Sequence, residues 1–334
     1  MNTRRHLLSG AAAIGALGSI PGWVSAQASA WPSKPISALV GYPPGGGTDV
    51  AARTLEPEMR KHLGQSMVIS NAPGAAGTIA MQRMLAAPRD GYTVAFVAGT
   101  DLILMPWAMP NPGYALRDVK LIGVMLETPF VVCTRPDLKA ANLDELAAQH
   151  EVGRNTPLRY ASFGDGSQPH LIFDGIAQRL RIDAIHVPYK GMQPVAADLA
   201  GGHIDVAVLP LAGPLPGLLQ SGKLRPIAAV TRERLPSLAA IPTIMEAKRG
   251  DLRDVLTQAW FGLVAPADTP PDVLERLSRA FSAAVASAPF QDFVRQFGGI
   301  RVDPMSLQAA DAYYRRDIDL LKRLFDTLSP PRKG

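Results

Sequence analysis

A glycine-rich turn joins an apolar run to an amphipathic helical pattern near the start of the chain. The apolar run, Ile36 to Val40, is typical of a buried β-strand, and the turn that follows is Tyr42-Pro43-Pro44-Gly45-Gly46-Gly47-Thr48-Asp49. After the turn, apolar side chains recur at the spacing of one helix face, at Ala52, Leu55, Met59 and Leu63. The segment therefore predicts a strand–turn–helix unit, which favours an α/β fold.

The helix start after such a turn leaves backbone N–H groups without partners, and the helix dipole adds partial positive charge there. It can therefore hold a small anion without a lysine or arginine. The turn lacks the Lys-Ser or Lys-Thr of a phosphate loop, and Val50 breaks the dinucleotide fingerprint. The expected anion is a carboxylate. The alternative is a tight turn without a ligand, in which Thr48 or Asp49 caps the helix.

A second turn of the same design follows the strand pattern that ends at Ser162. Residues 163–168 form the turn, and a helical pattern with Pro169 in its first turn follows, so Ser167 or Gln168 is expected at the cap. Ligands of open α/β sheets bind at the carboxyl ends of strands, so two facing domains would place both turns across one cleft. The alternative is two unrelated tight turns.

Strand and helix patterns alternate through the rest of the chain, which predicts α/β units with mainly parallel sheets. The C-terminal pattern from Leu307 to Leu328 predicts a long amphipathic helix that covers a domain core. The strand candidates are 36–40, 67–69, 93–97, 129–133, 158–161, 185–187, 206–209, 227–230 and 261–264.

The N-terminus has the pattern of an export signal. Arg4-Arg5 precedes a short apolar stretch, and Val24-Ser25-Ala26 fits the small-x-small cleavage rule, so residues 1–26 are interpreted as a cleaved, twin-arginine-type signal peptide. Ala26-Gln27-Ala28 is an alternative cleavage frame. The formal net charge of +5 comes without a basic run interleaved with aromatics, which argues against nucleic-acid binding. The single cysteine, Cys133, lies in an apolar run and is expected to be a buried, inert thiol. No metal-ligand spacing and no cofactor motif is found.

Several motifs, taken in order, resemble the periplasmic solute receptors of tripartite tricarboxylate transporters, the Bug family. The resemblance covers essentially all of the chain after the signal. The motifs are Trp31–Ile36, Tyr42–Asp49, Asn71–Gly77, Asp90–Thr93, Gly164–His170, Val187–Gly191, Asp198–Gly202 and Trp260–Pro266.

The resemblance implies a two-domain, type II-like Venus-flytrap fold. Domain 1 would comprise residues 31–130 plus 256–334, and domain 2 the inserted residues 131–255, with crossing segments near 130 and 255. It implies a monomeric periplasmic protein that passes a small carboxylate, such as a di- or tricarboxylate or an aromatic acid, to transporter membrane subunits. The residues expected to bind the ligand, chiefly through backbone amides, are Tyr42, Gly45, Gly46, Gly47, Thr48, Asp49, Ser162, Gly164, Gly166, Ser167, Gln168, His170, Tyr189 and Leu209.

The chain departs from the family pattern at two informative positions. Leu209 stands where relatives often have an aspartate, and a buried ammonium needs a paired acceptor, so the preferred ligand is predicted to lack a free amino group. Asp165 adds a negative charge to the second turn and is expected to face solvent.

Two other classes of function compete with the receptor. Ser162 or Ser167 with His170 and Asp174 supplies the residue types of a hydrolase, but no G-x-S-x-G elbow surrounds either serine, and no catalytic residues are predicted. His186 and His203 show no partner at ligand spacing. A sensory protein that presents its ligand to a membrane receptor kinase would need the same cleft.

Overall fold

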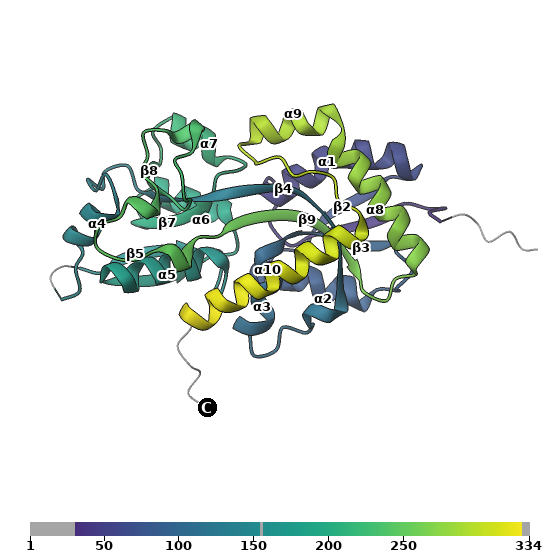
Figure 1. Cartoon of the computed structure of the whole chain (residues 1–334), viewed down its shortest axis with the longest axis horizontal. Coiled ribbons are helices and arrows are strands. Elements are labelled where there is room, and N and C mark those ends of the chain that lie inside the picture. Colours follow the sequence, from purple (N-terminus) through teal and green to yellow (C-terminus); the bar gives the residue numbers. More distant parts are fainter. Residues whose placement is uncertain (1–30, 154–155, 329–334) are drawn as a thin grey trace, which may run out of the picture. The chain divides into compact units, whose positions relative to one another are not determined.

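The computed structural model describes residues 31–153 and 156–328 (Figure 1), so the predicted signal peptide, residues 1–26, lies outside the described residues. Each of the nine predicted strands is present. The strands are β1 Ile36–Val40, β2 Met67–Asn71, β3 Thr93–Ala98, β4 Val119–Thr134, β5 Leu158–Ser162, β6 Ala184–Pro188, β7 Val206–Pro210, β8 Arg225–Ala229 and β9 Gln258–Pro266.

Helices lie between most of the strands, as the alternating pattern predicts. The α-helices are α1 Gly47–Leu63, α2 Thr78–Ala86, α3 Gly99–Ala108, α4 Leu143–Gln149, α5 Gln168–Leu180, α6 Met192–Ala200, α7 Leu215–Gln220, α8 Pro271–Ala286, α9 Ala288–Phe297 and α10 Leu307–Leu328. Short 3₁₀ helices are η1 Ala75–Gly77, η2 Leu116–Asp118, η3 Pro236–Leu238, η4 Ile244–Glu246 and η5 Arg253–Val255.

The strands pair in the order β2-β1-β3-β9-β4-β7-β5-β6, with β8 paired to β4. The expectation of mainly parallel sheets is wrong. The β1–β2, β1–β3, β5–β6 and β5–β7 pairs are parallel, whereas β9 runs antiparallel to β3 and β4, and β4 runs antiparallel to β7 and β8. The two strands that turn the sheet antiparallel are the long ones, β4 and β9.

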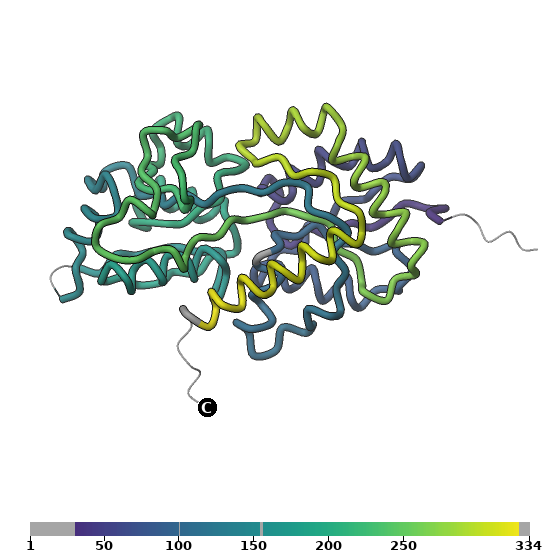
Figure 2. Tube along the Cα trace, viewed as in Figure 1, coloured from purple at the N-terminus to yellow at the C-terminus, as the bar shows by residue number. Residues whose placement is uncertain are grey.

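Strand β4 is much longer than the predicted run at 129–133 and serves two parts of the sheet. Its residues 119–129 pair with β9, and its residues 130–134 pair with β7. Figure 2 shows β4 and β9 running side by side. Along β4 most side chains are buried, because helices cover the strand and its neighbours lie on both edges. Cys133 is fully buried here, and burial raises the pKa of its thiol, which confirms the expected inert state.

The hydrophobic core is divided among the helices that cover the sheet. Helices α1, α8 and α9 bury Leu55, Leu277 and Phe290 against β1, β3 and β9. The predicted C-terminal helix is confirmed as α10, and it packs on β4, α3 and α5, with Asp317 accepting a hydrogen bond from Trp260 Nε1 at 2.6 Å. Within residues 31–153 and 156–328, no helix has the length and apolar character to cross a bilayer.

Candidate functional site: a cavity between two glycine turns

The first glycine turn is held in place by Asp49, which lies inside the first turn of α1. Helix α1 begins at Gly47 with Gly46 as the N-cap, so the alternative in which Thr48 or Asp49 caps the helix is wrong. Asp49 accepts hydrogen bonds from the backbone N–H of Gly45 at 2.9 Å and from Arg53 Nε at 3.0 Å. Burial alone would raise the pKa of Asp49, but hydrogen bonds from Arg53, Gly45 and Asn71 outweigh it and hold this pKa below its ordinary value.

The geometry of this turn leaves donors free at the start of α1. Gly45 has φ +77°, a conformation that favours glycine. The backbone N–H groups of Gly47 and Thr48 have no acceptor among the described residues. A Cβ at Gly47 would lie 3.0 Å from Cζ of Phe261, closer than an ordinary contact, so a side chain there would require the ring to shift by a few tenths of an ångström. The turn therefore offers N–H groups beside an aromatic wall.

The second turn is built from glycines and serines that bind one another. Gly164 (φ +132°) and Gly166 (φ +74°) both take left-handed conformations. Ser167 is the N-cap residue of α5, as expected, but its hydroxyl donates to the carbonyl of Gly164 at 2.7 Å and caps no helix N–H. Ser162 Oγ also lies 2.9 Å from that carbonyl. These serines stabilise the turn from within.

One cavity lies between the starts of α1 and α5. Its empty space, including the part open to solvent, is about 480 Å³. Most of its wall is apolar or aromatic, and its lining contains no lysine or arginine. The lining residues are Tyr42, Gly46, Gly47, Thr48, Ala98, Asp101, Phe130, Phe163, Gln168, Pro169, Met192, Gln193, Pro210, Ala259 and Phe261.

Of the residues expected at the site, the structure places five on this cavity: Tyr42, Gly46, Gly47, Thr48 and Gln168. The remaining nine, which do not line it, are Gly45, Asp49, Ser162, Gly164, Gly166, Ser167, His170, Tyr189 and Leu209. Most of these belong to the two turns or form hydrogen bonds within them, outside the cavity lining. Leu209 is fully buried in the core beneath α6 and α7, and the Tyr189 hydroxyl donates to Asp198 at 2.5 Å.

Asp101, in the first turn of α3, is a cavity residue that the sequence analysis missed. Its Oδ2 accepts a hydrogen bond from the Tyr42 hydroxyl at 2.5 Å, and its Oδ1 accepts one from the backbone N–H of Gln168 at 3.0 Å. Burial raises the pKa of Asp101 to about 6, although both hydrogen bonds act to lower it. The same burial, together with the Asp101 charge, raises the pKa of Tyr42 well above its ordinary value.

The only sequence signal for Asp101 was an acidic residue opening an otherwise apolar stretch, Leu102 to Met105. That pattern is equally typical of an acidic residue that stabilises a helix start. Its partners lie 59 and 67 residues away in the chain, so no local pattern could pair them.

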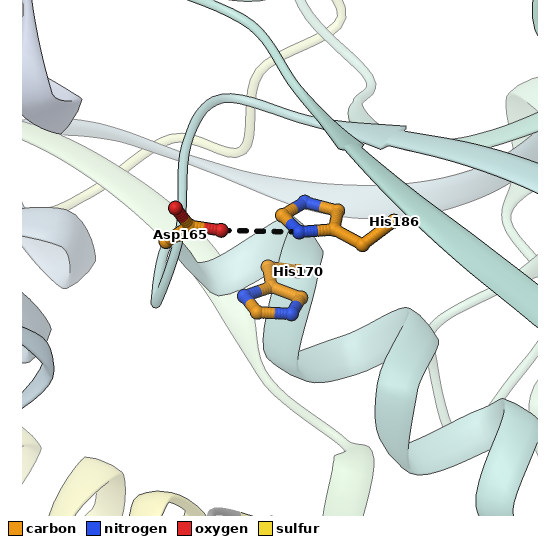
Figure 3. A group of neighbouring side chains, drawn as sticks. All are labelled: Asp165, His170 and His186. Atoms are coloured by element: carbon orange, nitrogen blue, oxygen red, sulfur yellow. Dashed lines mark ion pairs between the residues drawn. The ribbon is translucent and has the colours of Figure 1, made fainter.

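A second polar group, Asp165, His170 and His186, lies behind the second turn (Figure 3). Asp165 Oδ1 is 3.2 Å from His186 Nδ1, and the two imidazole rings stack with centroids 3.9 Å apart and planes 4° apart. The expectation that His186 has no partner is therefore wrong. Stacked parallel rings cannot both direct in-plane lone pairs at one ion, and His170 Nδ1 already accepts the N–H of Gly166 at 2.9 Å. The group as it stands supports the turn.

Ser162, His186 and Asp165 also contain the residue types of a hydrolytic triad. Ser162 Oγ lies 2.7 Å from His186 Nε2. However, Ser162 has no exposed surface and does not line the cavity, so no substrate reaches its hydroxyl. Burial, with the neighbouring His170, lowers the pKa of His186 to about 4. Asp165 is 83% exposed at its side chain, which confirms that it faces solvent.

The α/β fold with a cavity lined by two helix starts is that of a periplasmic-type solute-binding protein. The model of the tripartite tricarboxylate transporter family receptor matches residues 51–325, and the chain belongs to this family. It is 31% identical over 272 residues to the UPF0065 protein in the tcbD-tcbE intergenic region of Pseudomonas sp. (strain P51), with 80% of this chain and 79% of that protein covered. Protein BugT of Bordetella pertussis (strain Tohama I) is 31% identical over 263 residues, covering 78% and 79%.

Solved structures with the same fold agree with the family. The periplasmic binding protein BugD superposes with a TM-score of 0.80 at 28% identity, over 89% of this chain and 98% of that one. Rpa4515 of R. palustris, solved with adipate, gives 0.79 at 27% over 89% and 98%. MatC of Rhodopseudomonas palustris, solved with malate, gives 0.78 at 26% over 90% and 100%. The predicted family and binding-protein fold are thus confirmed.

The Tyr42–Asp101 hydrogen bond should make stability depend on pH in a defined direction. We expect Tyr42→Phe to lower the free energy of unfolding by about 1.5–3 kcal/mol at pH values above 6, because the lost bond is to a charged group. The bond lowers the pKa of Asp101, so its contribution is largest when Asp101 is ionised and shrinks as pH falls through about 6. Urea unfolding across this pH range measures it.

Tyr114→Phe is the matched control, since the buried Tyr114 hydroxyl donates to the neutral carbonyl of Leu102 at 2.8 Å. Its cost should be about 0.5–1.5 kcal/mol and nearly independent of pH over the same range. Equal pH profiles for the two variants would contradict the role given to Asp101.

Proposed function

We propose that this protein captures a small organic carboxylate in the cavity between α1 and α5 and delivers it to the membrane subunits of a tripartite transporter. The observation that carries the proposal is the pair of unpaired N–H groups, on Gly47 and Thr48, at the start of a 17-residue helix that opens on the cavity. Such a helix start stabilises a carboxylate without a cationic side chain.

Family membership supports the transport role over the hydrolase and sensory alternatives. The relatives solved with adipate and malate support a carboxylate as the ligand class. The apolar part of the lining, including Phe130, Phe163 and Phe261, suits the hydrocarbon or aromatic body of such an acid. Water can bridge the remaining gaps at little cost in affinity.

Gly47→Val is the direct test of the first turn. The new side chain would press on Phe261, which lines the cavity, and would cover the N–H groups at the start of α1. We expect calorimetry with a binding acid to show a loss of affinity greater than about tenfold, or about 1.4 kcal/mol. Gly217→Val in α7 is the control, because a Cβ there meets nothing within 4 Å. A folded Gly47→Val protein with unchanged affinity would remove this turn from the site.

We also propose two lobes, residues 31–130 plus 256–334 and residues 131–255, that close on the ligand. In support, β4 changes partners from β9 to β7 at residue 130, and β9 begins at Gln258. The Asp101–Gln168 hydrogen bond would then join the two lobes. Small-angle X-ray scattering should show a monomer whose radius of gyration falls when a binding acid is added. An unchanged radius at saturation would contradict closure.

Export to the periplasm through residues 1–26 completes the proposal and agrees with the periplasmic relatives. Mass spectrometry of the exported protein should give a mature chain that starts directly after Ala26. A mature chain that retains Met1 would contradict a cleaved signal.

A further inference from the structure

The cavity lining carries unpaired donors at the first turn, acceptors around Asp101, and the buried Gln193 amide, whose Nε2 and Oε1 have no partner among the described residues. We propose that the ligand carries, besides the carboxylate held at the start of α1, a proton-donating group, hydroxyl or ammonium, that binds Asp101 and the side-chain oxygen of Gln168. This inference rests on the proposed function, because it assigns the second end of the same ligand. Asp101 thereby selects against a ligand with a second carboxylate.

The start of α5 is already occupied by a carboxylate of the chain itself. Gln168 is the first residue of α5, and its backbone N–H donates to Asp101 Oδ1 at 3.0 Å. Pro169, the next residue, has no N–H to offer. The second turn, which the sequence suggested as a second anion site, therefore has its helix start filled by a side chain of the chain itself.

The side chain of Gln168 provides an unsatisfied acceptor in the same region. Gln168 is 1% exposed and lines the cavity, and its Nε2 donates to Thr257 Oγ1 at 2.7 Å. Nε2 also donates to the carbonyl of Gln258 at 3.4 Å, and because a carbonyl can only accept, this contact orients the amide and leaves Gln168 Oε1 buried without a partner. A buried acceptor without a partner is costly, so a ligand that donates a proton here gains more than one that cannot.

The negative charge of Asp101 is not balanced by a cationic side chain in the cavity. The partners that Asp101 has in the structure, the Tyr42 hydroxyl and the Gln168 N–H, are both neutral donors, and the cavity lining includes no cationic side chain. A second ligand carboxylate close to Asp101 would meet a like charge in a poorly screened space. A hydroxyl or ammonium would instead complete the hydrogen bonds of Asp101.

The two acidic residues of the glycine turns, Asp49 and Asp165, do not compete with Asp101 for this role. Asp49 is engaged by Arg53, Asn71 and the Gly45 N–H, and Asp165 is exposed beside His186. Because Asp101 supplies the acid that Leu209 does not, the prediction of an amino-free ligand loses its main reason. The ligand's donor can be either kind, and the experiment decides between them.

The experiment compares acids that differ in one group, using calorimetry at neutral pH on the wild-type protein and on Asp101→Asn. One series is butyrate, γ-hydroxybutyrate, γ-aminobutyrate and succinate; the other is benzoate, p-hydroxybenzoate, p-aminobenzoate and terephthalate. Asparagine keeps an acceptor for the Gln168 N–H and removes the charge. Thermal unfolding of the variant checks that it is folded, and the wild-type comparison stands without it.

We expect the wild-type protein to bind a donor-bearing acid at least about tenfold more tightly than the dicarboxylate of the same series, about 1.4 kcal/mol. Asp101→Asn should reduce that ratio by at least about tenfold, chiefly by strengthening dicarboxylate binding. Wild-type preference for succinate or terephthalate, or a ratio unchanged in the variant, would overturn the inference while leaving carboxylate capture intact. Failure of every acid to bind would instead contradict the proposed function, and the inference with it.

Discussion

A single buried carboxylate, that of Asp101, organises the polar chemistry of the cavity. It accepts one hydrogen bond from the hydroxyl of Tyr42, just after β1, and another from the backbone N–H of Gln168, at the start of α5. These bonds join the two chain segments that carry the glycine turns. A buried carboxylate is tolerated only where such donors reach it. Even so, burial raises its pKa to about 6, so its charge is held at a cost.

The hydrogen bonds of Asp101 determine which polar groups of the cavity wall remain without partners. With the start of α5 occupied by Asp101, the first turn contributes the unpaired N–H groups of Gly47 and Thr48 to the wall, and the start of α6 contributes those of Met192 and Gln193, among the residues described. Gly47 lies close against Phe261, where a Cβ would come within 3.0 Å of the ring, and the same ring forms part of the apolar wall. The site thus combines unpaired backbone N–H groups with a largely apolar wall. This combination suits an organic acid better than a free phosphate.

Much of the fold could be predicted from local patterns. Apolar runs bounded by proline and glycine marked each strand, and the spacing from Leu307 onward marked α10, because burial imposes these periods on the sequence itself. Strand direction was mispredicted, since it depends on which strands meet through β4 and β9. The first part of β4 was missed because Lys120, Gly123 and Glu127 interrupt its apolar run.

The site was predictable only where the backbone itself makes it. A glycine turn predicts a helix start, so Gly46, Gly47 and Thr48 could be predicted as cavity residues. Asp101 and the group around His186 could not, because their partners are far away in the sequence. Several expected residues, including Asp49 and Ser167, shape the turns from outside the cavity, because a turn's sequence does not tell which of its atoms face inward.

The most direct test of the central claim is a crystal structure of the protein with its tightest-binding acid. The account predicts a ligand carboxylate whose oxygens lie within hydrogen-bond distance of the N–H groups of Gly47 and Thr48, directly or through one water. A ligand carboxylate bound elsewhere, or held by the N–H of Gln168 in place of Asp101, would contradict it.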